Sequence, residues 1–193
     1  RYGPQVAVPR ILETYRRFGI KQSFFIPGWC IETYPDAVEA ILAGGHEIGH
    51  HGYLHEDPID APDQRDWFEK ALAAHHKYCG GTPAGYRAPV YNINQEVVDL
   101  LIEYGFRYDS SMMADDIPYR LKTARGGLWE MPVHWGTDDW PPFAHYAEIG
   151  YMMPVKAPSA GLLAFWEEFD AAYEAGGFFM LIVHPFLTGR LAR

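Results

Sequence analysis

Segments with strand-like and helix-like hydrophobic patterns alternate along this chain, and the alternation limits the folds that are open to it. Strands are expected at residues 21–26, 46–48, 84–88, 106–108, 128–135 and 178–183, the last being a continuous apolar run. Helices are expected at residues 9–18, 35–43, 63–78, 94–104 and 159–175. Strands that alternate with helices predict an α/β fold with parallel strands, either closed into a barrel or open as a doubly wound sheet.

The composition indicates a single globular domain over residues 1–193. Hydrophobic residues make up 48% of the chain, which is enough for a sizeable core at this length. The net charge of −9 offers no basic patch, so nucleic acid is not an expected partner. No apolar stretch is long enough to span a membrane, and the absence of a signal peptide slightly favours a cytoplasmic location. Cys30 and Cys79 are expected to be reduced, partly buried thiols.

Four histidines fall within residues 45–55 (GHEIGHHGYLH). His51 and His55 are four positions apart, so both imidazoles can reach one metal ion on a helical face or around a tight turn. The alternative is that they bond only backbone groups or solvent, but their place after a predicted strand and a glycine-rich turn favours metal binding. The role of His50 stays open. The remaining histidines of interest are expected to be structural or solvated: His46 at the start of the strand, and His75 and His76 on a polar helix face.

Polar side chains follow several of the other predicted strands. Arg87 lies at the end of residues 84–88, Asp139 and Trp140 follow residues 128–135, and His184 follows residues 178–183. In α/β folds the active site lies at the carboxyl ends of the parallel strands. We therefore expect these side chains and the histidine pair to share one rim of the sheet.

Each of these residue types suits a step of hydrolysis, and each has a structural alternative. His184 could act as a general acid near neutral pH, or could bond a backbone carbonyl at a strand end. Arg87 could hold a carboxylate through a bidentate contact, or could form a surface ion pair. Asp139 could orient a histidine and Trp140 could wall a sugar-sized pocket, or the two could form an acidic turn with a half-buried aromatic.

The order of these motifs resembles that of the polysaccharide deacetylases, the family with the NodB-homology domain (carbohydrate esterase family four). The resemblance covers most of the chain and includes residues 22–28 (QSFFIPG), 45–55, 86–89 (YRAP), Asp139-Trp140 and 182–184 (IVH). The segment HGYLH, followed by Glu56, is most similar to the branch that contains peptidoglycan deacetylase and allantoinase-like enzymes. The resemblance implies a distorted (β/α) barrel with fewer than eight strands.

The resemblance also implies a chemistry, which is hydrolysis of an amide by metal-bound water, typically removal of an N-acetyl group from an amino sugar. It implies a divalent metal, usually zinc, with His51 and His55 as two of its ligands. The remaining site residues that it implies are the catalytic acid His184, the arginine Arg87 that holds the catalytic base, Asp139 and Trp140 of the Asp-Trp motif, and Tyr91 as a substrate contact. Tyr91 stands one place later than the aromatic residue that many members carry directly after the proline.

The aspartate motif that supplies the base and the third metal ligand in this family is not found in these residues. We expect the strand that carries it to lie outside the sequence given. A peptidoglycan or chitin-like polymer is the expected substrate, and a small amide or ureide or an inactive binding domain of the same fold are the alternatives. The aromatic residues between Trp140 and Tyr151 could form a subunit interface in a homo-oligomer or a lid over the barrel.

Overall fold

The computed structural model describes residues 1–59 and 63–193 and divides them into two compact units. Unit 1 comprises residues 1–13 and 133–193, and unit 2 comprises residues 14–132. The border between the units falls within the first α-helix, α1 (Val8–Phe18). No helix of the described residues is both long and apolar enough to cross a membrane. Whether the units act as the single domain expected from the sequence stays a prediction.

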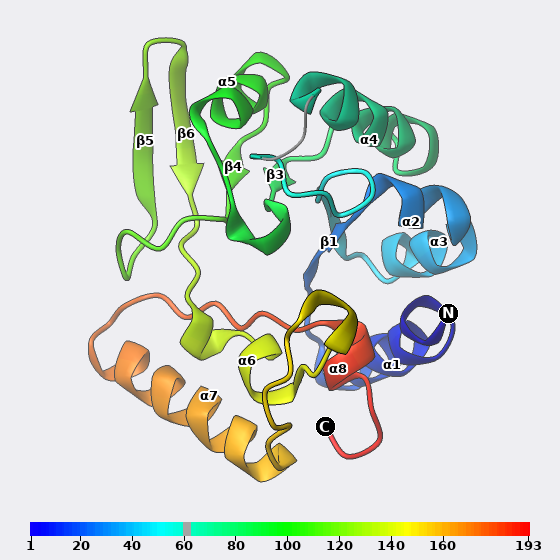
Figure 1. The fold of residues 1–193 in the computed structure, drawn as a ribbon, viewed down its shortest axis with the longest axis vertical. Helices are drawn as coiled ribbons and strands as arrows, with labels where there is room; N and C mark the ends of the chain where they lie inside the picture. Colours follow the sequence, from blue (N-terminus) through cyan, green and yellow to red (C-terminus); the bar gives the residue numbers. More distant parts are fainter. Residues whose placement is uncertain (60–62) are drawn as a thin grey trace. The chain divides into compact units, whose positions relative to one another are not determined.

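Unit 2 is built on a sheet in which five strands run parallel, as the alternation of strands and helices predicts. The strand order is β1-β2-β3-β4-β6-β5, and only the β5–β6 pair is antiparallel. This pair forms the hairpin at one edge of the sheet in Figure 1. The strands are β1 (Ser23–Ile26), β2 (Glu47–His50), β3 (Gly85–Tyr86), β4 (Tyr108–Asp109), β5 (Tyr119–Thr123) and β6 (Gly126–Glu130).

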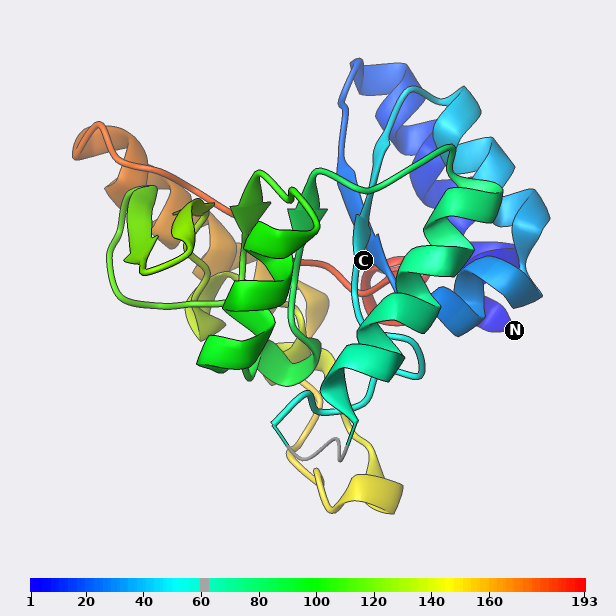
Figure 2. The same cartoon turned by 90° about the horizontal axis from the view of Figure 1, so that it is seen from above.

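The helices of unit 2 include one at residues 28–33 that the sequence signals did not predict, and three that follow those signals closely. They are α2 (Gly28–Thr33), α3 (Pro35–Ala43), α4 (Gln64–Tyr78) and α5 (Gln95–Glu103). Helix α5 starts where expected because the Asn94 side chain accepts a hydrogen bond from the Val97 N–H at 3.1 Å. Helices α2, α3 and α4 lie on one side of β1 and β2 (Figure 2). These helices therefore cover one face of β1 and β2, and the side chains at the ends of the strands can form a site.

The core of unit 2 lies between the sheet and helices α4 and α5. Its buried members are Phe68, Leu72, Tyr86, Ala88, Val97, Leu100, Leu101, Phe106 and Leu128. Gly85 makes the close approach of β3 to β4 possible, because a Cβ atom there would lie 2.1 Å from the ring of Tyr108. The short strands β3 and β4 are thus held at the centre of the sheet.

Unit 1 is mainly helical. It contains the π-helix η1 (Gly3–Ala7), the 3-10 turns η3 (Trp135–Thr137) and η4 (Ala147–Ile149), and helices α6 (Trp140–Phe143), α7 (Pro158–Glu174) and α8 (Pro185–Thr188). The prediction of a buried strand over residues 178–183 is wrong. Only Ile182 forms a bridge, with Asp138, and Leu181 is 38% exposed. A β-strand requires a hydrogen-bonding neighbour along its length, and this segment has one for a single residue.

His75 corrects a second expectation, because it is buried in the core of unit 2 rather than solvated. Its ring stacks on that of His50, with centroids 5.6 Å apart and planes 11° from parallel. Neither ring nitrogen of His75 has a hydrogen-bond partner among the described residues. Burial lowers the pKa of His50 to about 4 and that of His75 to about 3, so both imidazoles are neutral at neutral pH.

We predict that this histidine pair makes the protein acid-sensitive. Unfolded histidines take up protons below about pH 6.5 while the folded pair does not until about pH 4, so the free energy of unfolding falls as pH is lowered across this window. The expected slope is about 1.4 kcal/mol per pH unit for each histidine. His75→Phe should halve the pH dependence that the pair contributes. His76→Phe changes a histidine on the exposed face of α4 and should leave this pH dependence unchanged. Urea unfolding at several pH values tests this, and equal slopes in the two variants would contradict it.

Candidate functional site

The two predicted metal ligands come from the end of β2 and from the tight turn that follows it. His51 directly follows the strand and His55 closes the turn, and their ring centroids are 4.8 Å apart. The Nδ1 atom of His51 lies 2.7 Å from the carbonyl oxygen of Arg87, so Nδ1 carries the proton and donates it to this carbonyl. The lone pair of the His51 ring is therefore on Nε2. An imidazole in this tautomer can ligate a metal ion through Nε2.

Glu56 holds the turn between the two histidines. Its carboxylate accepts hydrogen bonds from the Tyr53 N–H at 2.9 and 3.1 Å and from the Leu54 N–H at 2.6 Å. Gly52 has a φ of +68°, and His55 adopts a left-handed φ of 64°, which is uncommon for a residue with a Cβ atom. Because a left-handed histidine costs free energy, the Glu56 contacts stabilise a backbone that brings His55 to His51.

Arg87 follows β3, the neighbour of β2, and is buried. Its Nε atom donates to the Ser110 carbonyl at 2.9 Å, and its Nη2 atom donates to the Ser110 hydroxyl at 2.6 Å. The guanidinium also lies over the ring of Phe25, with Cζ 4.4 Å from the centroid. With 8% of its surface exposed, Arg87 is not the exposed ion pair considered as an alternative from the sequence. Its predicted part in holding a catalytic carboxylate stays a prediction.

Tyr91, the predicted substrate contact, closes the 3-10 turn η2 (Pro89–Tyr91). Val90 and Tyr91 have φ values of 51° and 62°, so two consecutive residues with side chains occupy the left-handed region. The Tyr91 N–H donates to the Ala88 carbonyl at 3.1 Å. The turn directly after Arg87 is therefore strained and internally bonded, and the side chain of Val90 is half-exposed.

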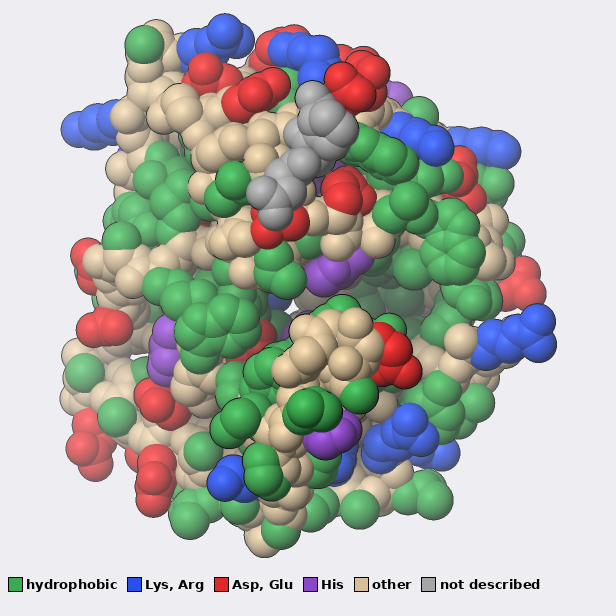
Figure 3. All heavy atoms as spheres, in the orientation of Figure 1, with side chains coloured by type: hydrophobic (Ala, Val, Ile, Leu, Met, Phe, Trp, Pro, Cys, Tyr) green, Lys and Arg blue, Asp and Glu red, His purple; other side chains and the backbone are tan. Residues whose placement is uncertain are grey.

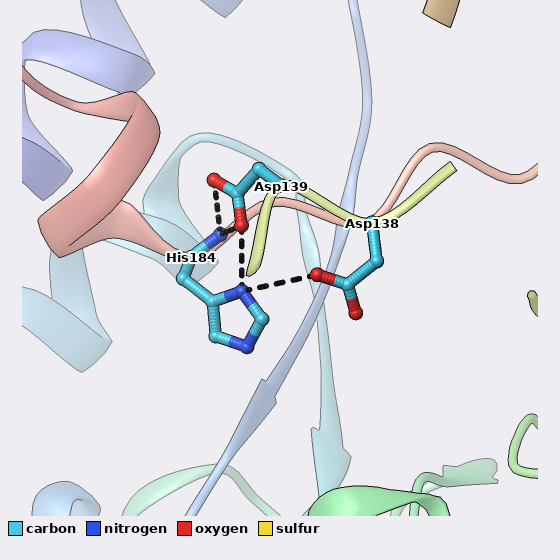
Figure 4. Close-up of side chains that lie close together, drawn as sticks. All are labelled: Asp138, Asp139 and His184. Atoms are coloured by element: carbon cyan, nitrogen blue, oxygen red, sulfur yellow. Dashed lines mark hydrogen bonds and ion pairs between the residues drawn. The ribbon is translucent and has the colours of Figure 1, made fainter. Parts of the chain in front are cut away.

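Unit 1 brings together Asp138, Asp139 and His184 (Figure 4). The Oδ1 atom of Asp139 lies 2.7 Å from Nδ1 of His184, and both Asp139 oxygens lie 3.0 Å from the His184 backbone nitrogen, which donates to them. The Thr188 hydroxyl also donates to Asp139. Asp139 is fully buried, so its carboxylate fixes the orientation and tautomer of the His184 ring. Because Nδ1 of His184 faces Asp139, proton exchange with a substrate would use Nε2.

A metal ion could also use the spacing of this cluster, because one ligand atom from each of the three residues lies within 4.8 Å of the others. Its hydrogen bonds favour another arrangement. The carboxylate of Asp139 is already an acceptor for the imidazole and the backbone of His184, and Oδ1 of Asp138 accepts the Trp140 N–H at 2.7 Å. We interpret the cluster as an oriented histidine flanked by Trp140, whose ring centroid lies 5.5 Å from that of His184.

The sequence-predicted residues thus fall into two groups. His51, His55, Arg87 and Tyr91 belong to unit 2, the first three at the carboxyl edge of the sheet. Asp139, Trp140 and His184 lie together in unit 1. His50 ends β2 and is fully buried, with Nε2 3.1 Å from the Phe68 carbonyl, so its contacts are those of a core residue. Sequence reasoning did not find Ser110, although a polar Asp-Ser-Ser segment after a predicted strand could have indicated it.

The surface carries charged side chains of both signs (Figure 3). Figure 3 shows acidic and basic side chains on the face that it draws. Over the whole sequence the acidic residues outnumber the basic ones, with a net charge of −9. Cys30 and Cys79 are partly buried free thiols, as predicted.

Comparisons with known proteins place the chain in a family. The sequence model of the polysaccharide deacetylase family matches residues 2–108. A peptidoglycan deacetylase of Helicobacter pylori is 28% identical over 98% of this chain and 74% of its own length. The fold is shared with a putative polysaccharide deacetylase from Mycobacterium smegmatis, at a TM-score of 0.95 and 37% identity, with 100% of this chain and 68% of that chain covered.

An allantoinase structure is also similar, with a TM-score of 0.84 and 25% identity over 100% of this chain and 64% of that chain. These structures confirm the predicted α/β fold with a mostly parallel sheet. The family model covers more than half of the 193 residues. The chain therefore belongs to the polysaccharide deacetylase family.

Proposed function

We propose that this protein is a metal-dependent hydrolase that removes the acetyl group from an N-acetylated amino-sugar polymer such as peptidoglycan. The observation that carries the proposal is the geometry of His51 and His55, two adjacent imidazoles of which the first has its tautomer fixed by the Arg87 carbonyl. Membership of the deacetylase family and the similarity to a peptidoglycan deacetylase support the choice of substrate.

The donor set fits zinc. Two imidazoles are ligands that zinc prefers, and His51 already presents the nitrogen that a metal needs. Among the described residues no third His, Cys, Asp or Glu completes a ligand group with this pair, so the residues assigned here supply two ligands. When bound, a divalent metal would polarise the acetyl carbonyl and lower the pKa of a water molecule.

The residues of unit 1 suit proton transfer to the leaving group. Asp139 accepts the Nδ1 proton of His184 and holds the ring, so Nε2 can deliver a proton to the amine that departs when the C–N bond breaks. The indole of Trp140 lies beside this ring and offers an apolar wall to a sugar. Arg87, held by Ser110, would orient the carboxylate that accepts a proton from water.

A second candidate function is hydrolysis of a small amide or ureide. The observation that favours it is the similarity of the whole chain to an allantoinase structure at 25% identity. The two functions differ in substrate size, and they are separated by offering the same preparation N-acetylglucosamine oligomers and allantoin. Release of acetate supports the deacetylase, and consumption of allantoin supports the alternative. Zinc binding without either activity would support an inactive binding domain.

We predict that His51→Ala and His55→Ala each weaken zinc binding at least tenfold, because each removes one of the few protein ligands that the ion has. Isothermal titration of the apoprotein with zinc chloride measures the affinity. His76→Ala, which removes an exposed imidazole from unit 2, is the matched control and should bind zinc like the wild type. Unaltered affinity in both site variants would refute the assignment of this metal site.

His184→Ala is expected to lower the turnover of an N-acetylglucosamine oligomer by a factor of about 10² to 10⁴, the usual contribution of a general acid. Zinc affinity should be unchanged, because the proposed ligands are in unit 2. Acetate release and zinc titration measure the two effects on the same sample. His145→Ala, an exposed histidine of unit 1, serves as the control. Wild-type turnover in His184→Ala would exclude His184 as the acid.

A further inference from the structure

Two carboxyl groups lie in the interior of unit 2, and the proposed reaction gives neither of them a role. Asp109 ends β4 and Glu130 ends β6, and the register of these parallel strands pairs the two residues directly. Both side chains are completely buried. Acidic side chains are almost never fully buried without partners, because their charged form loses its hydration. The pair therefore requires an explanation.

The hydrogen bonds around the pair leave one oxygen without a donor. Asp109 accepts from the Ser111 hydroxyl at 2.7 Å and from the Ser111 N–H at 3.2 Å. The Oε1 atom of Glu130 accepts from the N–H groups of Ser111 and Met112, both at 3.0 Å. Oε2 of Glu130 has no donor among the described residues. A proton on Oε2 removes this deficit, because the Glu130 carboxyl group then donates to the Asp109 carboxylate.

The surrounding charges decide which residue carries the proton. Burial and then the negative charge of Asp109 raise the pKa of Glu130 to about 9. Burial also raises the pKa of Asp109, but hydrogen bonds from Glu130 and Ser111 and the charge of Arg87 act in the opposite direction. Two phenols face the pair, Tyr86 and Tyr119, and burial raises the pKa of each, so they stay neutral. Asp109 thus keeps the charge and Glu130 the proton.

The pair is connected to Arg87 through the two serines that follow β4. The Ser111 hydroxyl donates to Asp109 and accepts the Ala88 N–H at 2.8 Å. Ser110 accepts two hydrogen bonds from the guanidinium of Arg87 through its carbonyl and its hydroxyl. The Ser110 hydroxyl in turn donates at 2.9 Å to the carbonyl of Met131, the residue that follows Glu130. The carboxyl pair therefore fixes the segment that fixes Arg87.

We propose that Asp109 and Glu130 share a single proton and act as a positioning pair that holds the Ser110–Ser111 segment, and through it the guanidinium of Arg87, at the carboxyl edge of the sheet. The shared proton follows from the pairing of the two side chains and the orphaned oxygen. The importance of the pair for catalysis rests on the proposed function, because it requires that Arg87 takes part in the reaction. Both Asp109 and Glu130 are positioning residues and do not touch the substrate.

Glu130→Gln and Glu130→Leu test the shared proton and the positioning separately. A glutamine can replace the protonated carboxyl group, since its amide donates to Asp109 while its carbonyl accepts from Ser111 and Met112. A leucine of similar size can do neither. Glu96→Gln makes the same exchange on the exposed first turn of α5 and is the matched control. Circular dichroism establishes that each variant is folded.

Infrared spectroscopy is the first measurement and needs no substrate. The wild type and Glu96→Gln should show the carbonyl stretch of a protonated carboxylic acid at pH 7, and Glu130→Gln should lack it. The free energy of unfolding gives a second reading. A folded state that keeps a proton which the unfolded chain releases loses stability as pH rises, so the wild type should weaken relative to Glu130→Gln between about pH 5 and pH 9. The shared proton would be refuted if the wild type lacked the infrared band, or if the unfolding free energies of the wild type and Glu130→Gln ran parallel with pH.

The positioning of Arg87 is read from its Nε–H resonance, identified by its loss in Arg87→Lys. This signal should be retained in Glu130→Gln and shifted or broadened in Glu130→Leu. With a deacetylation substrate, Glu130→Leu should lower kcat/KM about 100-fold relative to the wild type. The kcat/KM of Glu130→Gln should be at least about tenfold higher than that of Glu130→Leu. A glutamine variant as impaired as the leucine variant would overturn the positioning role. If the wild type hydrolyses no substrate but shows the infrared band and the Arg87 signal, the proposed function fails and the proton pair stands.

Discussion

The backbone of Arg87 is the point at which the predicted metal ligands, the sheet and the arginine side chain meet. Its N–H donates to the His50 carbonyl at 3.0 Å and so extends the pairing of β2 and β3 by one residue. Its own carbonyl accepts from the His51 imidazole. A displacement of β3 would therefore misplace the first histidine and the guanidinium together. The parallel ladder thus sets the site as well as the fold.

Local signals in the sequence predicted much of this architecture. Helix α4 and the cap of α5 appear within one or two residues of their expected positions, because caps and amphipathic periodicity act over a few neighbouring residues. The proximity of His51 and His55 could also be predicted, because the two residues are only four positions apart in the chain. By contrast, residues 178–183 have the composition of a buried strand, but a strand is stable only where a partner strand adjoins it, and composition does not carry that information.

The other errors and omissions have the same origin. His75 occupies a helix with many polar residues, yet its position along α4 directs it against His50 in the core. Glu130 looks like an ordinary charged residue in a hairpin until the register of β4 and β6 sets it against Asp109, twenty-one positions earlier in the chain. Polar groups of this kind acquire their chemistry from long-range pairing, which a single sequence does not reveal.

The left-handed backbone at His55 restricts which ligands evolution or design can place there. A φ of 64° is tolerated by asparagine and aspartate far better than by β-branched or bulky residues. Histidine is enriched in this region together with asparagine and aspartate, so an exchange of His55 for aspartate would keep the turn while it changed the side-chain donor atom from nitrogen to oxygen. The shape of one turn thus limits the side chains that can stand at this position to a short set, independently of what they bind.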